Sequence, residues 1–155
     1  MPLSSLYSTV PSLQSVRLRS FHLNWRGPTL TMRIDLPRFP DRPATTWTGA
    51  DHDTLQIHLQ FLAVDDLCTD GWIPGTLVDI SLAPLDERRL LTSIVAERIN
   101  FSFTASDTLT IGHISAFRGT GNGSDEGRHA FLSPLDAHRF TSVPNTYEST
   151  FYERI

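Results

Sequence analysis

The sequence has little cysteine, no lysine and no long apolar run, and each absence narrows what the protein can be. Its single cysteine, Cys68, cannot form an internal disulfide, which agrees with a reducing compartment. We expect Cys68 to be a small buried side chain. The longest uninterrupted apolar run is Phe61 to Val64, too short for a membrane-spanning helix, and the first residues lack the pattern of a secretory signal. These features predict a cytoplasmic protein that binds no membrane.

Sequence motifs of known chemistry are also missing. There is no phosphate-binding glycine loop, no Gly-x-Ser-x-Gly turn, no pair of cysteines and no His-Glu-x-x-His helix. The densest titratable cluster is Asp51-His52-Asp53. A metal site or an enzyme active site built on this cluster would also need His58. Strand alternation makes it unfavourable for His58 and Asp53 to converge in one site. The sequence therefore predicts no catalytic residue, no metal and no cofactor, and it predicts a hydrogen-bonded structural role for His113.

Charge is distributed unevenly along the chain. All 13 basic residues are arginines, and the net charge is −4. Residues 43–87 contain eight acidic residues and no basic one. This block argues against nucleic acid as a partner, because phosphate binding requires a basic surface. It permits a basic protein partner, while the alternative is that the acidic residues only solvate loop ends.

Alternating apolar and polar residues indicate a β protein. The clearest run covers residues 53–64, where Leu55, Ile57 and Leu59 alternate with polar side chains. One face of this central strand is predicted to be buried and the other exposed to water. We expect a mostly β fold, in which an antiparallel curved sheet, a sandwich or half-barrel of about six to eight strands, carries a short N-terminal helix.

The other elements are expected at intervals along the chain. The helix begins near Ser4 and ends before Pro11. Strands are expected at residues 14–25, 29–36, 76–82, 98–104 and 108–117, with a short or irregular strand after the turn at 65–66. Residues 87–97 fit either a helix or a strand, and the β pattern around them favours the strand.

Three of these strands carry specific expectations. A bulge near Arg19-Ser20 would keep both apolar sets of the first strand inward, with Trp25 in the core or at its rim. Pro84 is expected to close the strand at 76–82, because proline has no N–H for a sheet. Residues 98–104 and 108–117 are predicted to form a hairpin joined by residues 105–107.

The alternation stops after Phe117. We predict a β domain over residues 1–118, a flexible loop over 119–127 from its glycines, and a C-terminal tail over 128–155. The tail contains several aromatic residues, so we expect it to pack on the domain or on a partner subunit. A homodimer is therefore one of the alternatives.

Several short motifs, in their order and spacing, resemble those of a known family. They are Leu6-Tyr7, Pro11 to Leu13, Arg26 to Leu30, Thr46-Trp47, Asp53 to Ile57, Phe61-Leu62, Gly71-Trp72 and His113 to Phe117. In this succession, residues 3–118 are similar to the immunity protein 50 (Imm50) family of bacterial polymorphic toxin systems. The resemblance implies a cytoplasmic protein, encoded beside a secreted toxin, that binds the toxin domain and blocks it. It implies no catalytic residue.

The acidic block suggests where such a partner would bind. If the toxin domain is basic and nuclease-like, the toxin-binding candidates on one turn are Asp65, Asp66, Asp70 and Trp72. Asp51 and Asp53 lie about a strand length away, so they would form an alternative site.

The competing function belongs to a different class, that of small apolar-ligand-binding β proteins. Such a protein would enclose a cavity within its curved sheet. In this chain the cavity would be lined by Phe61, Phe101, Phe103 and Phe117. A densely filled interior would argue against this alternative.

Overall fold

The computed structural model describes residues 2–47, 49–71, 73, 75–120, 128–140 and 142–144. Its strands are β1 (Val16–Asn24), β2 (Thr29–Asp35), β3 (Thr54–Phe61), β4 (Asp65–Asp70), β5 (Thr76–Leu85), β6 (Arg89–Ala96), β7 (Ile99–Ser106), β8 (Leu109–Phe117) and β9 (Ala130–Phe131). The helices are α1 (Pro2–Leu6), the 3-10 turn η1 (Thr45–Trp47) and α2 (Pro134–Arg139). No helix in these ranges is long and apolar enough to span a membrane.

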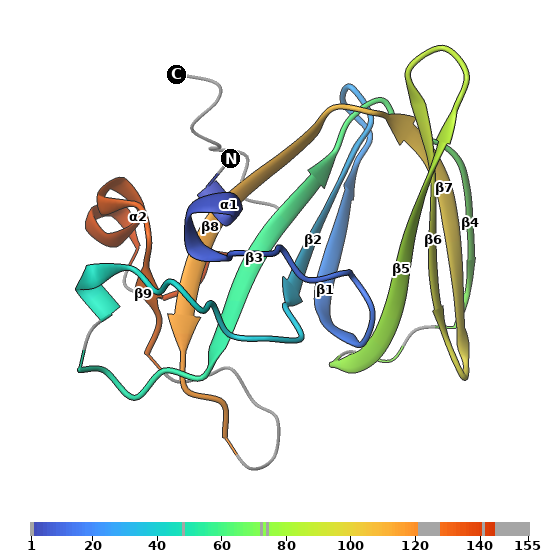
Figure 1. Cartoon of the computed structure of the whole chain (residues 1–155). Helices are drawn as coiled ribbons and strands as arrows, with labels where there is room; N and C mark the ends of the chain where they lie inside the picture. The colour runs from blue at the N-terminus through green and yellow to red at the C-terminus, as the bar shows by residue number, and fades with distance from the viewer. Residues whose placement is uncertain are drawn as a thin grey trace.

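The strands form one antiparallel sheet in the order β4-β7-β6-β5-β1-β2-β3-β8-β9. The sheet curls, so that β5, β6, β7 and β4 wrap around one side of the molecule, while β3 and β8 form the other side (Figure 1). The expected mostly β fold with a short N-terminal helix is confirmed, although the helix covers Pro2–Leu6 and not the stretch from Ser4 to Pro11. The sheet has nine strands rather than the expected six to eight, and β9, which pairs with the outer edge of β8, is the strand that the alternation did not indicate.

Aromatic rings fill the inside of the curl. Phe61 and Phe103 meet edge to face with their centroids 4.9 Å apart, and Phe101 lies 5.8 Å from Phe103. The pocket beside Phe101 measures about 20 Å³, which leaves room for about one water molecule. Phe117 lies apart from these rings and stacks on His129 at 4.4 Å. The four phenylalanines expected to line a ligand cavity therefore do not enclose one together.

The first strand follows the sequence prediction only in its first half. The register of β1 against β2 shifts between Leu18 and Ser20, which confirms the bulge. Val16 and Leu18 are buried, but Leu23 is 42% exposed and Trp25 is 80% exposed. β5 pairs with β1 only through its first three residues, so the end of β1 extends beyond the wrapped part of the sheet. The placement of Trp25 in the core or at its rim was therefore wrong.

The expected hairpin of residues 98–104 and 108–117 is wrong. β7 lies between β6 and β4, and β8 lies between β3 and β9. Both edges of each strand are thus already paired, and the short connection between them crosses from one side of the curl to the other. The hairpin partner of β7 is β6, since Ala96 pairs with Ile99 across a turn at Glu97 and Arg98. Residues 87–97 accordingly provide a strand, β6, and no helix.

Two expectations about β4 and β5 also need correction. Cys68 is exposed, because it lies on β4, the last strand of the sheet, where five of six residues are exposed. Pro84 does not close β5, which runs to Leu85. The structure tolerates proline there because β1 covers the other edge of β5 only along residues 76–78.

The polar face of β3, expected to be exposed to water, is buried. Gln56 and His58 have no exposed surface, and Gln60 is 4% exposed. The same holds on β2, where Thr31 and Asp35 are buried although they alternate with the apolar Leu30, Met32 and Ile34. The central strands are therefore covered on both faces, and their polar side chains need partners inside the protein.

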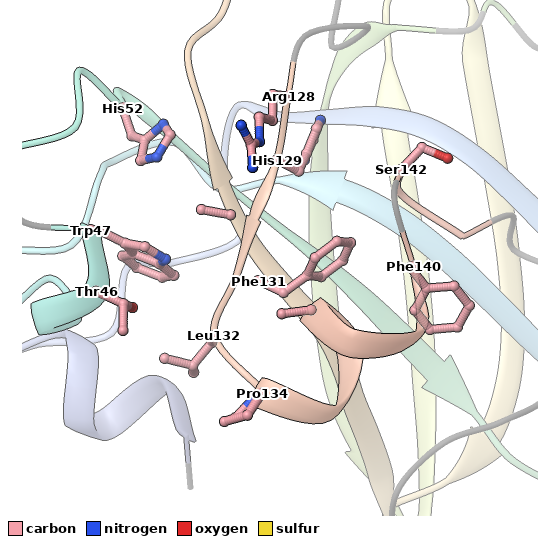
Figure 2. Close-up of a pocket in the computed structure, with 12 residues that line it drawn as sticks. Thr46, Trp47, His52, Arg128, His129, Phe131, Leu132, Pro134, Phe140 and Ser142 are labelled. Carbon is pink, nitrogen blue, oxygen red and sulfur yellow. The ribbon is translucent and has the colours of Figure 1, made fainter.

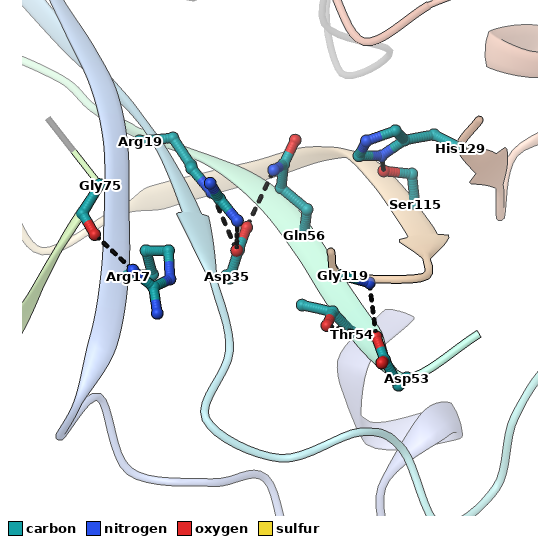
Figure 3. A network of polar contacts seen from close by, with 10 residues as sticks. All are labelled: Arg17, Arg19, Asp35, Asp53, Thr54, Gln56, Gly75, Ser115, Gly119 and His129. Atoms are coloured by element: carbon teal, nitrogen blue, oxygen red, sulfur yellow. Dashed lines mark hydrogen bonds and ion pairs between the residues drawn. The ribbon is translucent and has the colours of Figure 1, made fainter. Parts of the chain in front are cut away.

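Asp35 is the centre of the best-defined buried polar network. The Arg19 Nε and Nη2 atoms donate to Asp35 Oδ2 at 2.9 and 2.5 Å, and Gln56 Nε2 donates to Asp35 Oδ1 at 2.9 Å (Figure 3). The Arg19 and Asp35 side chains are 10% and 6% exposed. The network links β1, β2 and β3, so it holds together the middle of the sheet.

Candidate functional site

Acidic side chains gather at one corner of the curled sheet. There the chain bends from β3 into β4 and, beside this bend, turns from β5 into β6 (Figure 1). Asp65 and Asp66 from the bend and Asp86 and Glu87 from the turn line one open pocket of about 810 Å³. All four residues are exposed. We call these four residues the acidic corner.

Hydrogen bonds fix the two segments of the acidic corner to each other. Arg89, the first residue of β6, donates from Nη1 to the Ala63 carbonyl at 2.7 Å and from Nη2 to Thr104 Oγ1 at 2.9 Å. The Val64 N–H donates to the Pro28 carbonyl at 2.9 Å. The bend is thereby tied to β6, to β7 and to the turn before β2, so its carboxylates extend from a fixed backbone.

The charge of the corner is strongly negative. Four carboxylates line the pocket against one guanidinium, that of Arg89. Arg88, the other arginine of the turn, pairs with Asp107 at 3.3 Å, so it carries its own counter-charge. Among the described residues, no three His, Cys, Asp or Glu side chains converge to hold a metal ion. The corner is thus suited to an extended cationic surface.

The backbone at the corner adopts a conformation that glycine favours, yet it contains no glycine there. Ala63, Asp66, Glu87 and Arg88 have φ between 51° and 58°. Residues with a side chain are uncommon in this left-handed region, which costs about 1 kcal/mol each relative to glycine. The stability of the turns alone therefore does not explain why Asp66, Glu87 and Arg88 occupy these positions.

The β5–β6 turn allows a direct test of that statement. Replacing Glu87 by Asn and Arg88 by Gly will stabilise the protein by about 1 kcal/mol, because Asn-Gly is the preferred pair where both central residues have positive φ. Chemical denaturation measures the difference. Arg88→Ala, the control, removes the exposed ion pair with Asp107 but keeps a Cβ, and it should change stability by less than about 0.5 kcal/mol. A less stable Asn-Gly variant would show that the native side chains hold the turn.

The structure brings together only some of the residues that the sequence singled out. Asp65 and Asp66 are neighbours in the corner, whereas Asp70 lies at the opposite end of β4, paired with Asn100. Trp72 lies outside the described residues. Sequence reasoning did not nominate Asp86 and Glu87. Both residues lie in the turn between β5 and β6. The sequence left residues 87–97 as either a helix or a strand, so this turn was not predicted.

The alternative acidic pair lies at the far end of β3. Asp51 forms an ion pair with Arg118. Asp53 Oδ1 accepts the Gly119 N–H at 2.8 Å and the Thr54 hydroxyl at 2.8 Å (Figure 3), and these bonds hold the pKa of Asp53 below its ordinary value. Both carboxylates are thus engaged in closing the end of β8 against the start of β3.

Comparison with known protein families identifies the family to which this chain belongs. The model of the family described as immunity protein 50 matches residues 1–116. The chain belongs to the immunity protein 50 family. No curated protein and no solved structure matches it. The resemblance carried by the short motifs is therefore confirmed over most of the chain.

The immunity protein 50 match divides the structure into two parts. It includes β1 to β7, all but the last residue of β8, and therefore all four residues of the acidic corner. It ends before β9 and α2, which pack beside β8 (Figure 1). Any feature built from β9 and α2 is consequently a property of this chain that the family match does not describe.

His58 of this immunity protein 50 member does not join Asp51 and His52 in one site. His58 is fully buried, and neither of its ring nitrogens has a hydrogen-bond partner among the described residues. Its ring lies edge-on to that of His113, 4.9 Å away, and His113 Nδ1 lies 2.7 Å from Asp136 Oδ1 on α2. The buried position and hydrogen bond expected for His113 are therefore present. Burial, with further contributions from His113 and Arg33, holds the pKa of His58 well below its ordinary value.

This burial of His58 predicts a loss of stability in mild acid. The unfolded chain binds a proton at His58 below about pH 6.5, whereas the folded chain does not, so stability falls as the pH drops through that value, by up to about 1.4 kcal/mol per pH unit. Denaturation between about pH 7.5 and pH 5 measures this slope. His58→Leu should flatten it, while His138→Gln on the exposed side of α2 should not. An unchanged slope in His58→Leu would assign the acid sensitivity to another group.

Proposed function

We propose that this protein is an immunity protein that binds a cognate toxin domain as a stoichiometric inhibitor. The observation that carries the proposal is the immunity protein 50 match over residues 1–116. Inhibition of this kind needs a stiff scaffold with a complementary surface rather than catalytic groups. The curled sheet, filled by its aromatic core, is a scaffold of that kind.

The contact surface that we assign to the toxin domain is the acidic corner. Its four carboxylates are exposed, lie on fixed turns and are opposed by one arginine within the pocket. A basic toxin domain, such as a nuclease with a phosphate-binding active site, carries the complementary charge. The corner would then occupy the groove that otherwise receives nucleic acid. Because the toxin acts within cells, the proposal also places this protein in the cytoplasm of the cell that makes it.

Co-expression with the C-terminal domain of the toxin encoded beside the gene tests the proposal. We expect rescue of cell growth and a complex of equal stoichiometry in size-exclusion chromatography. The matched control is the same toxin domain expressed with an unrelated β protein of similar size, which should give neither result. A folded protein that forms no complex and rescues no growth would contradict the proposed function.

A further inference from the structure

A second pocket lies at the other end of β3, between η1, β9 and α2. It has a volume of about 980 Å³ and is lined from three separate elements (Figure 2). This size is at the upper end of the range of small-molecule sites. Most of its lining comes from residues 128–142, beyond the family match. We call it the C-terminal groove.

The floor of the C-terminal groove is apolar. Phe131 from β9 is 8% exposed, and Phe140, which follows α2, lies 6.3 Å from it between ring centroids. Leu132 also lines the groove, on the side of β9 where Trp47 and Thr46 lie (Figure 2). A hydrocarbon chain or an aromatic ring placed on this floor would be removed from water on one whole side.

The rim of the groove contains one arginine and two histidines among the residues that the structure describes. Arg128, His52 and His129 all line it, and no Asp or Glu is among its described lining residues. His129 is held in place, because its ring stacks on Phe117 and its Nδ1 lies 2.8 Å from Ser115 Oγ (Figure 3). Arg128 is the residue with a permanent charge among the described lining residues, so the rim favours an anionic group over a cationic one.

The other polar groups near the groove are buried or engaged within the protein. Trp47 is 3% exposed, and its Nε1 is buried, so a ligand in the groove does not reach it. Asp136 pairs with His113, and Asp51 pairs with Arg118. Asp53 accepts the Gly119 N–H and acts electrostatically on His52, so the cation that the rim offers a ligand is Arg128.

We propose that the C-terminal groove binds a small amphipathic carboxylate, with its apolar body on Phe131 and Phe140 and its carboxylate beside Arg128. An aliphatic acid and an aromatic acid share this chemistry. The inference is independent of the toxin-binding function, since it concerns a different end of the molecule.

Calorimetric titration of the full chain with decanoate and with 2-naphthoate tests the proposal. We expect saturable binding of one equivalent of at least one acid, and which acid binds identifies the ligand as aliphatic or aromatic. Decylamine, which has the same apolar body and the opposite charge, should bind at least about tenfold more weakly than decanoate if the aliphatic acid is the ligand. For an aromatic ligand, 2-naphthylmethylamine serves as the corresponding control.

Substitutions on α2 distinguish the groove from nonspecific binding. Ala137 is exposed and lines the groove, whereas the neighbouring His138 is exposed and does not. Ala137→Trp should weaken binding of the acid at least about tenfold by filling the groove, and His138→Trp should change it less than about twofold. Absence of saturable binding of both acids at about 1 mM, equal affinity for acid and amine, or unchanged affinity in Ala137→Trp would each overturn the proposal.

Discussion

Replacing Asp65, Asp66 and Glu87 by their amides will slow association with a basic toxin domain by about tenfold at low ionic strength. The three substitutions leave one carboxylate, Asp86, at the acidic corner. Charges at an interface act mainly by steering the encounter, so the dissociation rate should change much less. Stopped-flow mixing at about 20 mM and about 300 mM salt measures the effect, and the variant should also lose most of its salt dependence.

A second triple variant provides the matched control. Asp51→Asn, Asp70→Asn and Glu97→Gln remove the same number of charges from exposed positions outside the corner. This variant should associate nearly as fast as the unmodified protein. Equal slowing of both variants would attribute the effect to net charge, and an unchanged rate in the corner variant would exclude that face as the toxin contact. Because the corner side chains are exposed, thermal unfolding should show that both variants remain folded.

Asp35→Ala is expected to have the largest effect on stability, a loss of about 3–5 kcal/mol. The substitution leaves the guanidinium of Arg19, which is 10% exposed, without its carboxylate partner, and Gln56 loses the acceptor of its amide. An uncompensated buried charge is costly because it has lost its hydration as well. Urea denaturation measures the loss.

The double variant Arg19→Met with Asp35→Leu separates the charge from the packing. Apolar side chains of similar volume remove both charges, so this variant should recover more than about 2 kcal/mol relative to Asp35→Ala. The amide of Gln56 still loses its bond to Asp35, which leaves a residual cost of about 1 kcal/mol. A double variant no more stable than Asp35→Ala would show that the shape of the network, rather than the stranded charge, controls stability.

The alternation of side chains predicted the apolar interior but not what covers the opposite face. Leu30, Met32 and Ile34 on β2 are buried as expected, because the period of two follows from the strand backbone itself. Thr31 between them is also buried, and Arg33 is half-buried. On β8, the side chain that covers His113 is Asp136 of α2, which lies 23 positions later and follows no alternating pattern. A strand's own sequence does not show which later segment will pack on it.

The pairing of the strands was hard to predict for a related reason. A short connection between two strand patterns usually means a hairpin, and the prediction for residues 98–117 followed that rule. In this sheet one edge of β7 pairs with β6 and the other with β4, so no edge is left for β8. The true hairpin turn, Glu97-Arg98, contains neither glycine nor asparagine and so lacked the usual signal.

Only half of the candidate site was predicted from the sequence, because the other half depends on how distant strands pair. Asp65 and Asp66 are adjacent in sequence, so their proximity needed no knowledge of the fold. Asp86 and Glu87 join them only because β5, β6, β7 and β4 pair in succession and return the β5–β6 turn to the β3–β4 bend. Asp70 belongs to the same acidic block, but the length of β4 places it at the other end of the strand.

The length of β3 has a consequence for how the molecule can be occupied. Its eight residues span about 27 Å, with the acidic corner after one end and the C-terminal groove near the other. If the toxin contact is confined to the corner and the acid to the groove, the two ligands bind without touching each other. The strand between the two sites contains the buried polar residues Gln56, His58 and Gln60, so substitutions there test whether the acid changes the affinity for the toxin.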